Sequence, residues 1–294
     1  MSVVIEIAGV LTDPEFQRMR HMALELREFA SGVSVLIRSL LEVEFEPFLR
    51  AEGLLLEFPM HSVSSPIAFV PPSPSDLSAS CGNTYIGDTN AFIEFCAMKY
   101  GLADNLSEDE CTQLANEAWK TYRERSMHTF TYMRFAVDGE PMTPKDERVI
   151  FELFNDACPK ACENFAKLCE NGYAGLPVHR IVPGGWIQSG DVERDGRGDG
   201  AGGCVVNSDG VFEDETFCIS HDKAGILSMA NNGPHTNGAQ FFITLGALPW
   251  LDKNKVAFGR VISGMKIIQA IGRLKVVYDR PIVPCIIAEA GQYV

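Results

Sequence analysis

The sequence has no long apolar run, a shortage of positive charge and no paired cysteine framework. No uninterrupted apolar stretch approaches the roughly 18 residues of a membrane-spanning helix, so no membrane segment is predicted. Lys and Arg number 25 against 39 Asp and Glu, which gives a formal net charge of −14. General nucleic-acid binding depends on clustered Lys and Arg that neutralise phosphates, so this balance argues against a nucleic-acid partner.

The nine cysteines are an odd number and include no CxxC pair. The opening MSVVIEIAGV has no basic segment before its apolar run, and it is predicted to form a strand, not a signal peptide. Without an export signal, we expect reduced thiols and a cytoplasmic location. Cys158 and Cys162 lie four residues apart at a helix start marked by Pro159, without two further ligands at suitable spacing. The sequence therefore predicts no metal site and no cofactor.

At 294 residues, of which 46% are hydrophobic, the chain is long enough for two packed domains. We expect an α/β domain over residues 1–105, a linker helix over 106–127 and a second domain over 128–294. Ser107 and Glu110 have the spacing of a capping box, which predicts where the linker helix begins.

Periodicity and turn signals predict seven elements in the first domain. The strands are Val3–Val10, Val33–Leu41, Ile67–Val70 and Thr84–Ile86, and the helices follow Asp13, surround Phe45–Arg50 and span Ala91–Tyr100. This order resembles the thioredoxin/glutaredoxin fold, with Ser65-Pro66 where that family carries a cis-proline. The place of the redox CxxC motif holds Leu11–Pro14 and offers no thiolate, so disulfide chemistry is not expected there. An unrelated small α/β domain is the alternative.

Two segments of the second domain place long polar side chains among apolar residues. They are VHRIVPGGWIQSGD at 178–191 and GILSMANNGPHTNGAQFFITLG at 225–246. A buried arginine such as Arg180 is costly unless it is hydrogen-bonded. Together with the FELF, FEDE-F, WLD and FG-V strings, in this order, the segments closely resemble the cyclophilins, a family of peptidyl-prolyl cis-trans isomerases. The resemblance runs from about Thr129 to Val294.

The resemblance implies a closed antiparallel β-barrel of eight strands with two capping helices. The apolar pattern agrees, because it predicts a strand over Val149–Phe154 and helices over Pro159–Cys169 and Gly264–Ile271. His179 should point to the face opposite Arg180 if this segment is a strand.

The implied chemistry is rotation about the bond that precedes a proline. That rotation takes tens to hundreds of seconds unaided, and catalysis needs no nucleophile, only a pocket for the proline ring and donors that stabilise the pyramidal nitrogen. By resemblance, Arg180 is the donor to the prolyl nitrogen and Gln188 holds Arg180 in place. The resemblance also implies the residues that contact the substrate: Asn231 and Gln240 on its backbone, and Met229, Phe242 and Leu251 around the proline. Trp250 matches the indole associated with cyclosporin-type ligands.

The sequence departs from active cyclophilins at two positions of the pocket. Gly185 stands where many members have phenylalanine, and Lys255 stands where many have histidine. Loss of the aromatic wall weakens proline binding by about one to a few kcal/mol, on the scale of burying such a side chain. Trp186 is a candidate replacement. The glycine-rich loop over 196–203 flanks the site and affects access. We expect a weak isomerase.

Three functions stay open at this point. The protein is an isomerase of proline-containing protein segments, a module that binds such segments with little turnover, or a structural component. The chain most resembles a subgroup of cyclophilins that is regarded as poorly active and is associated with ciliated cells. That resemblance implies a cilium or flagellum, with axonemal or tubulin-associated partners.

Overall fold

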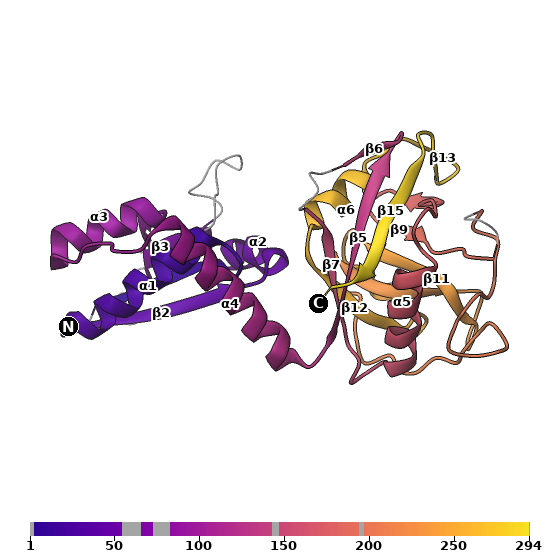
Figure 1. Cartoon of the computed structure of the whole chain (residues 1–294), viewed down its shortest axis with the longest axis horizontal. Coiled ribbons are helices and arrows are strands. Elements are labelled where there is room, and N and C mark those ends of the chain that lie inside the picture. The colour runs from indigo at the N-terminus through magenta and orange to yellow at the C-terminus, as the bar shows by residue number, and fades with distance from the viewer. Residues whose placement is uncertain (1–2, 55–65, 73–82, 143–146, 194–196, 294) are drawn as a thin grey trace. The chain divides into compact units, whose positions relative to one another are not determined.

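The computed structural model describes residues 3–54, 66–72, 83–142, 147–193 and 197–293. The chain divides into two compact units, residues 1–126 and 127–294 (Figure 1). In the described ranges, no helix has both the length and the apolar character needed to cross a membrane. Each unit has its own sheet and its own buried apolar residues.

The first unit is an α/β unit, as predicted. Its strands are β1 (Val3–Val10), β2 (Val33–Leu40), β3 (Ile67–Val70) and β4 (Thr84–Gly87), and their order in the sheet is β2-β1-β3-β4. The pairing of β1 with β2 is parallel, and the other two pairings are antiparallel. A parallel pair needs a crossover connection, which the first helix provides. The resemblance to thioredoxin stays a prediction, and Ser65 lies outside the described residues.

In the described part of this unit, four helices accompany the sheet: α1 (Pro14–Phe29), α2 (Glu42–Ala51), α3 (Thr89–Tyr100) and α4 (Glu108–Ser126). The Asp13 carboxylate accepts the backbone N–H of Glu15, and Pro14 occupies the first turn of α1. At the start of α4, Ser107 and Glu110 exchange the hydrogen bonds of the predicted capping box. Both helices therefore begin where the sequence signals placed them, and α4 packs against α1 within this unit.

The second unit is a curled antiparallel sheet whose eight-strand path is β15-β5-β7-β12-β10-β11-β9-β8. The strands are β5 (Thr129–Val137), β7 (Val149–Leu153), β8 (Arg180–Val182), β9 (Trp186–Ser189), β10 (Ile226–Asn231), β11 (Asn237–Thr244), β12 (Ala257–Ser263) and β15 (Cys285–Gln292), with the short β6 (Glu140–Pro141) beside β5. An isolated bridge joins Pro177, which precedes β8, to Ile286 of β15. The expected eight-strand antiparallel architecture is confirmed.

The two predicted helices of this unit are α5 (Pro159–Asn171) and α6 (Met265–Gly272) (Figure 1). The Phe165 ring of α5 is buried among four other aromatic rings, with centroids 5.1–5.8 Å away. The thiols of Cys158 and Cys162 donate to backbone carbonyls of β12, at 3.5 and 3.4 Å. A 3-10 turn, η2 (Pro249–Leu251), and a hairpin of β13 (Val276–Val277) and β14 (Arg280–Pro281) complete the unit.

Candidate functional site

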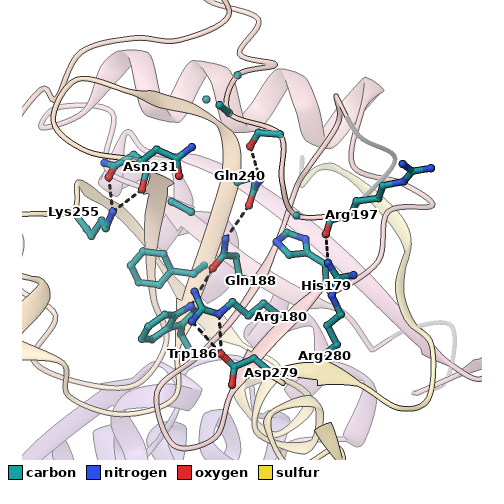
Figure 2. Close-up of a pocket in the computed structure, with 18 of the residues that line it drawn as sticks. His179, Arg180, Trp186, Gln188, Arg197, Asn231, Gln240, Lys255, Asp279 and Arg280 are labelled. Atoms are coloured by element: carbon teal, nitrogen blue, oxygen red, sulfur yellow. Dashed lines mark hydrogen bonds and ion pairs between the residues drawn. The ribbon is translucent and has the colours of Figure 1, made fainter. Parts of the chain in front are cut away.

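The second unit contains a groove of about 340 Å³, shown in Figure 2. Seven of the residues that the sequence singled out line it: Arg180, Trp186, Gln188, Asn231, Gln240, Phe242 and Leu251. They come from four strands and from η2, and the glycine-rich loop and the β13–β14 turn complete the lining.

Two residues that resemblance assigned to the site are not part of the lining. Met229 is 1% exposed and pairs across the sheet with Phe241, which packs against Phe165 in the barrel core. Neighbours directly opposite on paired strands share a face, so Met229 faces the core and does not line the groove. Trp250 is 64% exposed and lies outside the lining.

The strand register explains how three of the lining residues meet. Arg180 on β8 is opposite Gln188 on β9, and Gln188 is opposite Phe242 on β11. Residues opposite one another on antiparallel strands project to the same face, so these three side chains form one row across three strands. A guanidinium, an amide and an aromatic ring thus lie side by side on the groove floor.

A chain of amide hydrogen bonds runs along the middle of the groove (Figure 2). Gln188 Nε2 donates to Gln240 Oε1 at 2.8 Å, and Gln240 Nε2 donates to the Gly200 carbonyl at 2.7 Å. Trp186 Nε1 donates to Gln188 Oε1 at 3.3 Å. Each amide has its oxygen and nitrogen assigned by its neighbours, so the remaining donor and acceptor positions have fixed directions.

Asp279 supplies the bonds that the structure shows for Arg180. The Arg180 Nε and Nη2 atoms donate to Asp279 Oδ2 at 3.1 and 3.0 Å, and the guanidinium lies 5.4 Å from the centre of the Trp186 ring. Gln188, which was expected to hold Arg180, instead bonds to Trp186 and Gln240. Asp279 and Tyr278 form the tip of the β13–β14 hairpin, where both have positive φ, as a two-residue type I′ turn requires.

Trp186 forms an aromatic wall with Phe242. Their ring centroids are 5.7 Å apart. Gly185 is absent from the lining, whereas the indole of the next residue, Trp186, contributes to it. Behind the wall, His221 stacks on Phe242 with a centroid distance of 6.0 Å.

His221 belongs to an arrangement that looks like a hydrolase triad. Its Nδ1 is 2.9 Å from Asp252 Oδ1, and its Nε2 is 3.0 Å from Ser228 Oγ. Ser228 is fully buried, and its hydroxyl is also 3.0 Å from the Val256 carbonyl. A nucleophile needs access to its substrate, so this cluster is structural. The cluster connects the turn that carries Leu251 to the ring of Phe242, because His221 bonds to Asp252 and stacks on Phe242.

Lys255 occupies the end of the groove near Asn231. Its Nζ donates to the Asn231 carbonyl at 2.9 Å and also to Asn231 Oδ1. The amide nitrogen of Asn231 donates to Asn237 Oδ1 at 3.0 Å. Lys255 is half-buried, and burial lowers the pKa of its ammonium below the usual value. The lysine thus binds both oxygens of the residue that resemblance assigns to the substrate backbone.

His179 also lines the groove, although the alternation of a strand placed it on the face opposite Arg180. It is 7% exposed, and burial lowers its pKa, although Asp191 and Gln240 act in the opposite direction. Beside it, Gly198 has φ +89°, and a Cβ there would lie 2.5 Å from the imidazole ring. Only glycine lets the loop approach His179 this closely.

Comparison with known proteins adds one family and three relatives. A family model described as "Cyclophilin type peptidyl-prolyl cis-trans isomerase/CLD" matches residues 136–292. Proteins named "Probable inactive peptidyl-prolyl cis-trans isomerase-like 6" are 43% identical over 175 residues in Mus musculus and 40% over 176 in Bos taurus, which is 56% of this chain in both cases. The protein of that name in Homo sapiens is 38% identical over 202 residues, 65% of this chain. The matches cover 53–60% of the relatives' own lengths, so the chain spans little more than half of each.

Proposed function

The chain belongs to the cyclophilin-type peptidyl-prolyl cis-trans isomerase family, and from that premise we propose that its groove binds proline-containing protein segments and isomerises the X-Pro bond slowly. The observation that carries the proposal is the row of Arg180, Gln188 and Phe242 beside the indole of Trp186. The row puts a fixed cationic donor next to an apolar surface of the kind that a proline ring needs.

The reaction needs no covalent step. The barrier of about 18–20 kcal/mol comes from the lone pair that nitrogen shares with the carbonyl. Arg180 lowers this barrier if it donates a hydrogen bond to the prolyl nitrogen as that atom becomes pyramidal, because the bond is stronger in the transition state than in the planar ground state. The bonds to Asp279 use Nε and one hydrogen of Nη2, which leaves Nη1 for the substrate.

The substrate backbone is assigned to Gln240 and Asn231. The Gln240 amide is oriented by Gln188 and Gly200, so its position on the groove is fixed before a substrate binds. The Asn231 oxygens are bonded to Lys255, so a substrate N–H has to share or displace that cation. This competition supports a slow reaction. The names of the relatives describe those proteins as probably inactive, which also supports a slow reaction here.

The test is exchange-spectroscopy NMR on a short Ala-Pro-Phe-type peptide, with wild-type protein, Arg180→Ala and Arg273→Ala as a matched control. Arg273 is an exposed arginine that follows α6 and does not line the groove. We expect faster cis/trans exchange with wild type and with the control, and at least a tenfold loss in Arg180→Ala, because removal of one preorganised donor commonly costs about 10²–10³ in rate. Equal exchange rates for wild type and Arg180→Ala would overturn the assigned role of Arg180.

A second reading of the same groove is a binding module. Peptide shifts without exchange catalysis in the same NMR experiment would favour it, and would identify a cyclophilin fold that holds a partner.

A setting in the cilium or flagellum, with axonemal or tubulin-associated partners, rests on resemblance alone and stays a prediction. If the protein remains in the detergent-soluble fraction when axonemes are prepared, that prediction fails.

A further inference from the structure

The groove carries an excess of positive charge that the whole chain does not share. Among the described residues, its charged lining consists of four cations, Arg180, Arg197, Lys255 and Arg280, and one carboxylate, Asp279. The chain as a whole has a formal net charge of −14. A cationic groove in an acidic protein is a local feature of the site, and a local field of this sign attracts anionic groups.

The one carboxylate of the lining is already engaged. Asp279 pairs with Arg180, whereas Arg280 donates from Nη2 to the Arg197 carbonyl at 2.6 Å. Within the described part of the chain, the structure shows no ion pair for Arg197, Arg280 or Lys255. Three cations of the groove therefore have no counter-charge among the described residues, with Lys255 at one end and the two arginines at the other (Figure 2).

Lys255 is the most informative of the three because it is half-buried. The bonds that the described residues give its ammonium go to the two oxygens of Asn231, which are dipoles and not charges. The nearby Asp214 raises its pKa but accepts bonds from Asn237 Nδ2 at 2.8 Å and from the His235 backbone at 2.9 Å. A partly desolvated cation without a paired anion is costly, and an incoming anion recovers part of that cost.

We propose that the groove prefers proline-containing segments with an acidic side chain, carboxylate or phosphate, within a few residues of the proline, and that Lys255 binds this side chain. The inference rests on the proposed function, since it names the substrate class of the same groove. On binding, the ammonium leaves the Asn231 carbonyl for the acidic group, which frees that carbonyl for the substrate backbone. The movement of the Lys255 ammonium thus accounts both for the cation in the groove and for the Asn231 carbonyl that it covers in the absence of substrate.

The experiment is an NMR titration of full-length protein with matched peptides that contain one Ala-Pro unit. The arms carry alanine, glutamate or phosphoserine at each position from two before to three after the proline. We expect the best acidic peptide to bind about fivefold more tightly than its alanine counterpart, the scale of a partly exposed ion pair. The advantage should disappear in Lys255→Gln and persist in Lys266→Gln, a matched change at an exposed position of α6 outside the groove. It should also shrink in 0.5 M salt.

Each outcome of the titration supports or overturns the inference. Preference for glutamate peptides supports a carboxylate ligand, and preference for phosphoserine alone supports a phosphate ligand. Equal binding of acidic and alanine peptides overturns this inference and leaves the proposed function standing. Absence of binding by every peptide overturns both. An acidic preference that survives in Lys255→Gln, with the folded state verified by its spectrum, refutes the role given to Lys255.

Discussion

Replacement of Asp279 by asparagine removes the carboxylate that holds Arg180 and keeps the shape of the hairpin tip. Asp279 has φ +63°, a region that asparagine tolerates better than most residues. Asparagine is also nearly the same size, so the turn and its neighbour Tyr278 stay in place. The change therefore isolates the charge of the Arg180–Asp279 pair from the backbone that presents it.

The expected magnitude follows from the exposure of the pair. The side chains of Arg180 and Asp279 are 46% and 40% exposed, so water screens their attraction. Pairs of this kind contribute about 0.2–1 kcal/mol. If the lost energy appears as disorder of the guanidinium in the transition state, the upper half of this range corresponds to a fall in kcat/KM of about three- to fivefold.

The assay is the NMR exchange rate of an Ala-Pro-Phe-type peptide, with Asp138→Asn as the matched control. Asp138 is an exposed aspartate at φ +54°, in the turn between β5 and β6 and outside the groove. The control should leave the rate unchanged. If Asp279→Asn leaves the rate unchanged or raises it, while Arg180→Ala still abolishes exchange, then Asp279 does not position Arg180 for turnover and the reasoning fails.

Three further predictions concern other parts of the second unit. Gly185→Phe should not raise the exchange rate, because Trp186 and Phe242 already form an aromatic wall and a Cβ at position 185 would lie 3.0 Å from Val182 Cγ1; a several-fold rise would contradict this. The pKa of His179 is lowered by burial, so the unfolded chain binds more protons below about pH 6.5 and stability falls as the pH drops through that range. The thermal midpoint should therefore fall less between pH 7.5 and 5.5 in His179→Gln than in wild type, and an equal fall would contradict this. Alkylation at pH 7.5 followed by peptide mapping should modify the exposed Cys218 before Cys158, because burial raises the pKa of the Cys158 thiol to about 12; the reverse order would refute it.

The sequence predicted those features that depend on residues close together in the chain. Asp13-Pro14 and the Ser107–Glu110 box begin helices where expected, because a cap depends on residues within one turn. The cyclophilin strings likewise led to seven residues of one groove, six on strands and Leu251 on η2.

What the sequence did not predict depends on side chains that meet across the fold. Arg180 and Asp279 are 99 positions apart, and nothing in the local sequence of either points to the other. To predict the bonds from Lys255 to Asn231, one must know how the two segments that carry these residues are positioned relative to each other. Hydrophobic periodicity does not provide this information. His179 was expected to face away from Arg180, because neighbouring residues of a strand point to opposite faces. However, β8 begins only at Arg180, so this rule does not apply to His179.

The pairing of β5 with β15 has a consequence for synthesis. These strands lie at opposite ends of the second unit's sequence, yet residues 131–137 pair with 285–292. Contacts between distant segments form late, because a long loop must close before they stabilise the chain. On the ribosome, the barrel remains without its closing strand until β15 has been made. A nascent chain that stops before β15 exposes the backbone edge of β5 and is a substrate for chaperones or a site of aggregation.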